Sequence, residues 1–212
     1  MNVLIVSGAT REPIDDVRFL SNFSTGRTGA ELAAELAARG HRVALLCGEG
    51  AATPPGPGEV ERFGSTADLE ARLGRRLAAG QCDLVVMAAA VSDYRPADAN
   101  RGKIDSEIAE LWLRLVRNPK LLPRIRSLSP RPLRVVGFKL TVGADSAARR
   151  EAVAAQFSAG GVDCVVHNDL EEIRRSPVHP FWLYRGPDSE PAKCEGARAL
   201  ASALASWAAP GS

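Results

Sequence analysis

The sequence predicts an α/β domain in which a mostly parallel sheet is flanked by helices. Five short apolar runs, rich in β-branched residues, have the pattern of strands buried on both faces of such a sheet. They span residues 2–8, 42–48, 83–90, 133–140 and 163–168. Four segments with helical periodicity separate them, over residues 30–40, 66–80, 118–128 and 145–161. Strands that alternate with helices in this order favour a doubly wound, Rossmann-like sheet.

The ends of these elements carry recognisable signals. Several helical segments finish in Gly, the usual C-terminal stop, and Ser65 or Thr66 is suited to cap the helix over 66–80. The C-terminal stretch 178–209 predicts a hairpin followed by an amphipathic helix. The Pro- and Gly-rich segment 52–59 is expected to connect two strands and is too short to separate domains.

Residues 93–118 interrupt the alternation of strands and helices. The segment is too long for an ordinary connection, and its "LWLRLV" core (111–116) alternates apolar with polar residues. This pattern predicts a two-stranded excursion or an edge strand. We therefore expect one domain over residues 1–212, from which a flap formed by residues 93–118 protrudes.

Composition excludes several classes of protein. The chain has 212 residues, with 27 Lys and Arg against 25 Asp and Glu, so its net charge of +2 does not indicate a nucleic-acid binder. No apolar run approaches the roughly 18 residues of a membrane span, and the N-terminus lacks a signal-peptide pattern. We expect a cytoplasmic protein that binds neither nucleic acid nor membrane. The four cysteines and three histidines lack metal-ligand spacing, so no metal site built from protein ligands is expected.

Small and polar residues follow several of the predicted strands. In an open α/β sheet the ligand binds beyond the carboxyl ends of the strands, where the strand order reverses. Ser24 and Gly26 lie where the first long helix begins, so unpaired backbone N–H groups and the helix dipole favour an anion there. Arg18 and Arg27 are candidates for charge-assisted contacts to it. Taken singly, each signal also fits an ordinary helix cap, close packing or a solvated charge.

Taken together, these motifs resemble a known family. "SGATREPIDDVRFLSNFSTGRTG" (7–29) is similar to SGGTREPIDPVRxISNxSSGKMG, the opening of phosphopantothenoylcysteine synthetase, also called phosphopantothenate–cysteine ligase. "MAAAVSDYRP" (87–96) resembles A-A-A-V-A-D-Y-x-P, and "LVRNPKLL" (115–122) resembles L-x-x-N-P-x-I/L. Lys103-Ile104, "VGFKL" (136–140) and "VVHNDL" (165–170) continue the resemblance in order along nearly the whole chain.

The resemblance implies an activity and its co-substrates. The family condenses phosphopantothenate with cysteine through an acyl-nucleotidylate, uses CTP or ATP with Mg²⁺, and forms homodimers. Phe138-Lys139-Leu140 looks like the stand-alone form of the enzyme, and Met1 lies directly before the first strand. No flavin decarboxylase domain, and hence no flavin, is therefore expected. The choice between CTP and ATP stays open.

The resemblance also implies roles for particular residues. Lys103, ten residues after Asp93, corresponds to the family's flap lysine and is the expected catalytic cation. Asn22 corresponds to the asparagine that handles the acyl intermediate, and Arg18 to its partner in the second half-reaction. The residues expected to bind the nucleotide are Gly8, Thr10, Ser24, Gly26, Ala89, Ala90, Asp93, Phe138, Lys139 and Asn168. Mg²⁺ is expected to be held mostly by phosphate oxygens and water.

Some positions depart from the family pattern and keep alternatives open. Asp16 stands where Pro is usual, and the flap has K-I-D-S, in which Asp105 replaces a second lysine. A nucleotide-binding homologue without this activity, or a ligase for another carboxylate, is therefore the alternative. An NAD(P)-dependent reductase is less favoured, because G-x-G-x-x-G is absent after the first strand. Trp112 is expected either to form a dimer contact or to cover the chain's own core.

Overall fold

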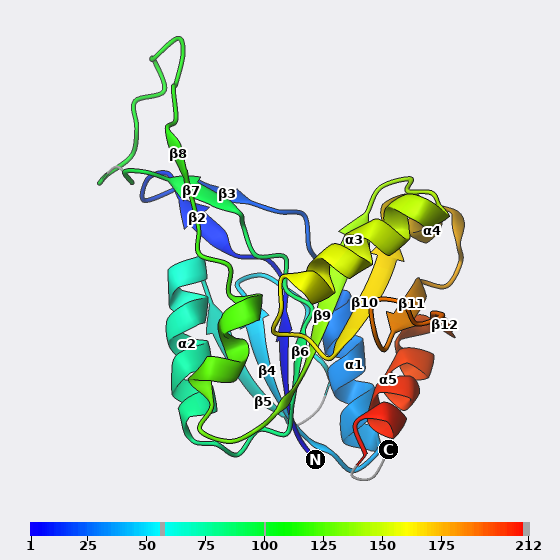
Figure 1. Ribbon diagram of the computed structural model, residues 1–212. Coiled ribbons are helices and arrows are strands. Elements are labelled where there is room, and N and C mark those ends of the chain that lie inside the picture. The colour runs from blue at the N-terminus through cyan, green and yellow to red at the C-terminus, as the bar shows by residue number, and fades with distance from the viewer. Residues whose placement is uncertain (56–57, 100, 210–212) are drawn as a thin grey trace.

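The protein is described by a computed structural model over residues 1–55, 58–99 and 101–209. Within these ranges a central sheet contains β1 (Asn2–Ser7), β4 (Arg42–Gly48), β5 (Glu59–Phe63), β6 (Leu84–Met87), β9 (Arg134–Thr141), β10 (Cys164–Asp169), β11 (Pro180–Tyr184) and β12 (Ala192–Glu195). Their spatial order is β12-β11-β10-β9-β6-β1-β4-β5 (Figure 1). The six strands β5, β4, β1, β6, β9 and β10 are parallel to one another. Beyond β10, β11 and β12 extend the sheet in antiparallel pairing. The predicted mostly parallel, Rossmann-like sheet is confirmed.

The strand order places the switch point beside β1. From β1 the chain proceeds to β4 and β5 on one side and then to β6, β9 and β10 on the other. The switch point therefore lies between β1 and β6, which pair from Val3–Leu84 to Val6–Met87. An isolated parallel pairing of Ala9 with Ala90 extends this contact beyond the ends of both strands.

Helices cover both faces of the sheet. The helices α1 (Arg27–Ala38) and α5 (Gly196–Trp207) share one core with Val3 and Ile5 of β1. On the other face, α2 (Thr66–Ala78) and the 3₁₀ helix Leu122–Leu128 pack with Leu4 and Val6. The helix α3 (Ser146–Ser158) packs on β9 and β10 (Figure 1). Successive β1 side chains thus enter opposite layers, as the period of two requires.

Several predicted elements differ in their limits. The helix expected over 118–128 is a 3₁₀ helix limited to Leu122–Leu128, because Pro119 and Pro123 lack the N–H that an α-helical ladder needs. The strand expected over 83–90 ends at Met87. Ser65 caps α2 as expected, since its side chain accepts the Asp68 N–H.

Two small hairpins stand above the carboxyl ends of the strands. The flap begins and ends with β7 (Tyr94–Pro96) and β8 (Leu115–Arg117), which pair antiparallel and confirm the two-stranded excursion. The insert after β1 forms a second hairpin, β2 (Arg11–Pro13) with β3 (Phe19–Ser21), which was not predicted. Figure 1 shows the flap projecting away from the sheet beyond this hairpin.

The first turn of α1 approaches the end of β1 very closely. The Ser7 hydroxyl donates a hydrogen bond to the Gly26 carbonyl oxygen over 3.0 Å. A Cβ added to Gly29 would lie 2.1 Å from Ser7 Oγ and 2.3 Å from Ser7 Cβ. Glycine at position 29 is therefore what allows the helix N-terminus to sit over the switch point.

We expect Gly29→Ala to lower the free energy of unfolding by about 2 kcal/mol, because the new methyl group overlaps Ser7. Adding Ser7→Gly should restore part of the loss, since it removes both atoms that are overlapped. Gly74→Ala in α2 is the matched control: its Cβ meets open space, so it should raise stability by about 0.5–1 kcal/mol. Urea unfolding measures all variants, and a Gly29→Ala protein as stable as wild type would contradict the close approach.

Candidate active site

The loops after β1 and β6 are joined by backbone hydrogen bonds. The Ala90 N–H donates to the Gly8 carbonyl over 2.8 Å, and the Thr10 N–H donates to the Ala90 carbonyl over 3.3 Å. Thr10 is fully buried, and its hydroxyl accepts the Ser92 N–H over 2.9 Å. Ala89 is half-buried beside these contacts. Thr10 and Ala90 therefore hold the two loops together, and their contact with a nucleotide stays a prediction.

The N-terminus of α1 lies over these loops. Gly26, the N-cap of α1, has a left-handed conformation with φ 71°, and Gly8 has φ 84°. A Cβ on either glycine would come within 2.7 Å of Ala51 Cβ, so glycine is required at both positions for conformation and for space. Ser24 and Arg27 are exposed at this end of the helix. The backbone arrangement is the one expected of an anion site.

The insert folds back over the loop after β6. The Asn22 side-chain amide donates to the Val91 carbonyl over 3.4 Å, and the Ser21 hydroxyl donates to the Thr10 carbonyl over 2.7 Å. Beside these contacts lies an open pocket of about 210 Å³, which is lined by Leu20, Asn22, Ser92, Asp93, Tyr94 and Leu115. Asn22 and Asp93 are thus brought to one pocket, and their roles in it stay a prediction.

Asp93 is engaged in an ion pair at the rim of this pocket. Its carboxylate lies 2.5 Å from the Lys120 ammonium, and both side chains are exposed. The Asn118 N–H donates to the Asp93 carbonyl over 2.8 Å. Lys120 is a neighbour that the sequence did not assign to the site, although it lies within the "LVRNPKLL" motif (115–122) of the resemblance.

Arg18 and the flap meet at one buried carboxylate. Asp15 Oδ1 accepts the Arg18 N–H over 2.7 Å, and Asp15 Oδ2 accepts the Ile104 N–H over 3.0 Å. The Arg18 guanidinium lies 3.3 Å from the same carboxylate. Burial would raise the pKa of Asp15, but three backbone N–H donors and the Arg18 charge outweigh it and lower that pKa. Asp15 is therefore an anion that fixes Arg18 and the flap together.

Lys103 lies between Gly102 and Ile104, whose backbone N–H groups both donate to carboxylates of the insert. Its neighbour Gly102 donates an N–H to Asp16 Oδ2 over 2.8 Å. Lys103 itself is exposed, and its ammonium has no ion-pair or hydrogen-bond partner among residues 1–55, 58–99 and 101–209. The catalytic role of the Lys103 ammonium stays a prediction.

Other predicted site residues lie at the ends of β9 and β10. Lys139 is half-buried within β9, directly opposite His167 on the neighbouring strand β10. Phe138 packs edge-on against Phe181 at 6.4 Å. The Asn168 amide lies 3.0 Å from His179 Nε2, so it is already engaged within the protein. The contact of Phe138, Lys139 and Asn168 with a nucleotide stays a prediction.

A buried polar cluster that the sequence did not predict lies beside them. The Thr141 hydroxyl donates to Asp169 Oδ2 over 2.6 Å, so it accepts from His167 Nε2, which is 2.8 Å away. This assigns the Nε2–H tautomer to His167, and leaves its buried Nδ1 with no partner in the described part of the chain. The only signal in the sequence is that these polar residues end two neighbouring parallel strands.

The charges of this cluster follow from its surroundings. Burial and the positive charge of Arg149 lower the pKa of His167, so the ring is neutral near pH 7. Burial would raise the pKa of Asp169, but the Thr141 hydroxyl and three backbone N–H groups hold it well below its ordinary value. The cluster thus pairs a neutral imidazole with a carboxylate that stays ionised.

The four cysteines are free thiols. Cys47, Cys164 and Cys194 are buried, and Cys82 is half-buried. Burial raises the pKa of every one of these thiols, to about 11 for Cys82 and about 12 for Cys164. None of them carries a thiolate near neutral pH.

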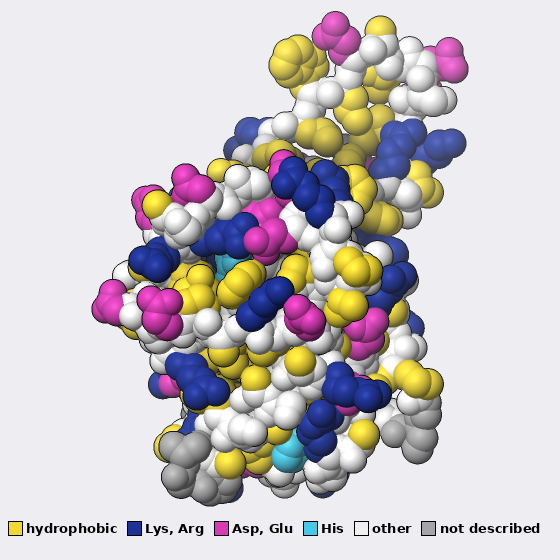
Figure 2. Space-filling model, turned by 90° about the vertical axis from the view of Figure 1, so that its right-hand side faces the viewer, with side chains coloured by type: hydrophobic (Ala, Val, Ile, Leu, Met, Phe, Trp, Pro, Cys, Tyr) yellow, Lys and Arg dark blue, Asp and Glu magenta, His cyan; other side chains and the backbone are white. Residues whose placement is uncertain are grey.

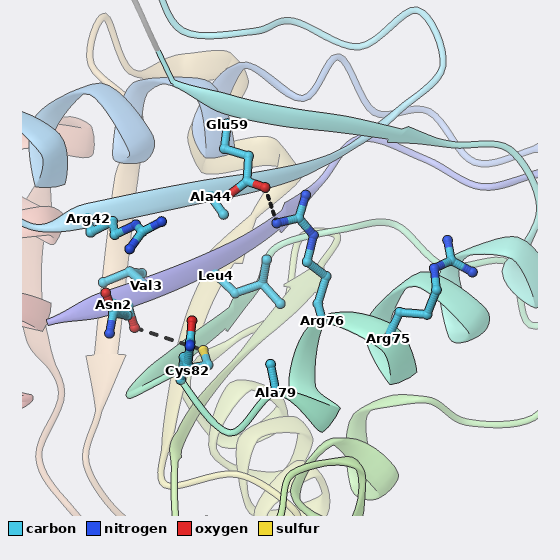
Figure 3. Close-up of a pocket in the computed structure, with 11 residues that line it drawn as sticks. Asn2, Val3, Leu4, Arg42, Ala44, Glu59, Arg75, Arg76, Ala79 and Cys82 are labelled. Carbon is cyan, nitrogen blue, oxygen red and sulfur yellow. Dashed lines mark hydrogen bonds and ion pairs between the residues drawn. The ribbon is translucent and has the colours of Figure 1, made fainter.

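A second hollow, of about 290 Å³, lies at the amino ends of the strands (Figure 3). It is lined by Arg42, Arg75 and Arg76 among others, and Arg76 is paired with Glu59. A doubly wound sheet binds its ligand at the switch point, beyond the carboxyl ends of the strands. This hollow lies at the opposite ends of the strands. The candidate site is therefore the smaller pocket beside Asn22.

Residues 1–55, 58–99 and 101–209 contain no group of three His, Cys, Asp or Glu side chains arranged to hold a metal ion. Across these residues, no helix combines the length and the apolar character that crossing a bilayer requires.

The fold and these loops define a Rossmann-like protein with a candidate binding site at its switch point. The chain belongs to the family described as the DNA/pantothenate metabolism flavoprotein C-terminal domain, whose model matches residues 1–178.

Two curated relatives are coenzyme A biosynthesis bifunctional proteins CoaBC. The protein of Escherichia coli K12 is 30% identical over 192 residues, which are 86% of this chain and 46% of the relative. That of Mycolicibacterium smegmatis is 32% identical over 209 residues, which are 94% of this chain and 50% of the relative. The chain spans about half the length of the curated relatives it matches.

Solved structures share the fold. The DNA/pantothenate metabolism flavoprotein from Streptococcus pneumoniae superposes with a TM-score of 0.85 at 25% identity, covering 98% of this chain and 97% of that one. A Cab2 variant in complex with phosphopantothenate-cysteine superposes with a TM-score of 0.78 at 20% identity, covering 98% and 86%. This second likeness shows the fold.

We expect the free energy of unfolding to fall as the pH drops from about 7.5 to about 5.5. His167 has a lowered pKa in the folded protein, so below its unfolded pKa the unfolded chain binds a proton that the folded chain does not. One such proton changes stability by at most about 1.4 kcal/mol per pH unit. His167→Gln keeps an N–H donor for Thr141 and cannot be protonated, so its slope should be smaller.

Urea unfolding at several pH values measures these slopes. Circular dichroism at about pH 7.5 controls for the fold of the His167→Gln protein. Equal slopes for the two proteins would show that His167 does not set this pH dependence.

Proposed function

We propose that this chain is a ligase that joins phosphopantothenate to cysteine through an acyl-nucleotidylate, in coenzyme A biosynthesis. Relatives that are 30–32% identical bear coenzyme A biosynthesis in their names. A structure with the same fold is a complex with phosphopantothenate-cysteine. The proposal takes residues 1–212 as one nucleotide-binding domain with the flap as its excursion.

The observation that carries the proposal is the contact from Asn22 to the Val91 carbonyl. It folds the insert over the loop after β6, so that Asn22 and Asp93 line the same pocket. The residue proposed to handle an acyl group and a residue proposed to contact a nucleotide thus border one space. A protein that only bound a dinucleotide would not need this insert.

The proposed reaction has two half-reactions. The pantothenate carboxylate attacks the α-phosphorus of CTP or ATP, forming the acyl-nucleotidylate and releasing pyrophosphate. The cysteine amine then attacks the acyl carbon, and the nucleoside monophosphate leaves. In the first half-reaction an anion approaches a phosphorus that already carries negative oxygens, so catalysis depends on nearby cations and N–H donors.

We propose that particular residues of the chain supply such groups. The N-terminus of α1 offers backbone N–H groups near Gly26, and Lys139 and Lys103 are the cations proposed to contact the phosphates. Asn22 is proposed to bind the acyl group, and Arg18 to assist the second half-reaction. Mg²⁺ bound to the triphosphate would neutralise part of its charge. The Asp93 carboxylate is already paired with Lys120, so the phosphate oxygens and water would be the main ligands of the Mg²⁺ ion.

The unusual flap sequence does not argue against a working enzyme. Asp105 Oδ1 accepts the Glu107 N–H over 3.0 Å, so that carboxylate is engaged with its own flap backbone. It makes no ion pair with Lys103. Asp105 therefore leaves the Lys103 ammonium available, and the assay decides between this ligase and the alternative, a nucleotide-binding homologue without the activity or a ligase for another carboxylate.

The activity is tested by pyrophosphate release with phosphopantothenate, cysteine, Mg²⁺ and either CTP or ATP. We expect release with one of the two triphosphates, and formation of phosphopantothenoylcysteine. Lys103→Gln should lower kcat/KM by about 100-fold or more, because it removes a cation from the charged transition state. Lys193→Gln, on the distant edge strand β12, is the matched control and should leave kcat/KM unchanged.

No pyrophosphate with either triphosphate would overturn the ligase. Pyrophosphate released without phosphopantothenate, but with another carboxylate, would favour a ligase of different substrate. Full activity in the Lys103→Gln protein would remove that residue from the mechanism.

The flap presents an apolar surface that no other described part of the chain covers. Trp112 is 86% exposed and Leu111 is 48% exposed, so the alternative that Trp112 covers the chain's own core is wrong. Figure 2 shows hydrophobic side chains gathered on the projecting flap. We propose that a second copy of the chain covers this surface in a homodimer.

Trp112→Ser should therefore weaken the dimer by about tenfold or more in Kd, since a large apolar side chain at the centre of an interface contributes about 2 kcal/mol or more. Sedimentation velocity over a range of concentrations measures the change. Val178→Ser, at an exposed apolar position outside the flap, is the control and should leave the dimer intact. A wild-type protein that sediments as a monomer at all concentrations would contradict the proposal.

A further inference from the structure

Two neighbouring carboxylates hold the flap backbone on either side of Lys103. On one side, the Gly102 N–H donates to Asp16 Oδ2 over 2.8 Å, and the Asp16 N–H donates back to the Gly102 carbonyl over 3.3 Å. On the other side, the Ile104 N–H donates to Asp15 Oδ2 over 3.0 Å. The backbone of Lys103 is therefore fixed at both neighbours while its side chain remains exposed.

The same turn carries the other residues proposed for the chemistry. Arg18 donates its N–H to Asp15 Oδ1 over 2.7 Å, and the Ile14 N–H donates to the Arg18 carbonyl over 2.9 Å. The chain then continues through β3 to Asn22. The two carboxylates thus connect Lys103 to the turn of Arg18 across 86 and 89 positions of sequence.

The two carboxylates differ in what else they do. Asp15 is buried and also accepts the N–H groups of Val17 and Arg18, so the turn itself depends on it. Asp16 is exposed, and Gly102 is the one hydrogen-bond partner of its carboxylate within the described residues. Asp16 can therefore be changed without removing the turn. An Asp16 variant tests the attachment of the flap alone.

We propose that Asp16 is a positioning residue, which together with Asp15 holds Lys103 in its working place before any substrate binds. This inference rests on the proposed function, in which Lys103 acts on the charged transition state. A cation whose backbone is already held loses less conformational entropy in reaching that state than one on a free loop. Proline at position 16 would offer neither the carboxylate nor the N–H.

Amide hydrogen exchange in the unliganded protein tests the attachment directly. Asp16→Ala should raise the exchange rate at Gly102 by about fivefold or more, because a hydrogen bond to a charged acceptor is lost. Asp16→Asn keeps an acceptor oxygen without the charge, so it should raise the exchange rate at Gly102 by less than Asp16→Ala does. Asp98→Ala is the matched control, since it breaks the 3.2 Å ion pair with Arg114 elsewhere in the flap and should leave Gly102 unchanged.

Single-turnover pyrophosphate release then tests whether Asp16 acts through Lys103. Asp16→Ala should lower the rate about fivefold to tenfold, with little change in the phosphopantothenate concentration that gives half of the maximal rate, and Asp16→Asn should retain most of the rate. In a Lys103→Gln background, Asp16→Ala should cause no further loss.

The outcomes separate the inference from the proposed function. Unchanged exchange at Gly102 in Asp16→Ala overturns the attachment, and an equal rate loss in the Lys103→Gln background overturns the positioning role. Faster exchange in Asp16→Ala, combined with a wild-type protein that releases no pyrophosphate, supports the attachment and overturns the ligase.

Discussion

The candidate site depends on how closely the first turn of α1 approaches the end of β1. Ser7 donates to the Gly26 carbonyl, and Gly29 leaves no room for a side chain between the two elements. Because Ser7 and Gly26 touch, the residues between them must leave the sheet and return to the same place. The β2–β3 hairpin is the result, and it carries Arg18 and leads to Asn22 beside the loop after β6. A single close contact thus creates both the helix N-terminus at the switch point and the insert beside it.

Buried carboxylates then fix the loops around this contact. Glu12 accepts the N–H and the hydroxyl of Thr66 and so ties the insert to the start of α2. Asp15 ties the insert to the flap, and Asp169 ties the loop after β9 to the end of β10. The oxygens of a buried carboxyl group must be satisfied by hydrogen bonds, and backbone N–H groups of nearby loops are the available donors. Three separate loops are held at this edge of the sheet by the same physical requirement.

The parts that sequence could predict are those specified by local pattern. The apolar runs around Val3–Val6 and Val165–Val166 indicated buried strands, which the structure confirms, and the motif around Asn22 predicted a site beside the carboxyl end of β1. The helix over 118–128 was wrong because prolines override an apolar period that otherwise fits a helix. The β2–β3 hairpin was missed because strands of three residues are too short to show an alternation.

The contacts inside the site were beyond prediction for a different reason. Asp16 and Gly102 are 86 positions apart, and neither carries a local signal of the other. His167 and Thr141 are brought together only by the parallel pairing of β9 with β10. Such polar contacts follow from the register and the loop paths, which the residue pattern of either segment alone does not contain.

The burial of the thiols has a consequence for a protein that would handle free cysteine. Thiol–disulfide exchange needs an accessible thiolate, and burial raises the pKa of Cys82 to about 11 and that of Cys164 to about 12. Cystine, the oxidised form of the proposed substrate, therefore finds no reactive partner on the chain. On the proposed function, the same packing that completes the sheet keeps the protein from forming mixed disulfides with the oxidised form of its own substrate.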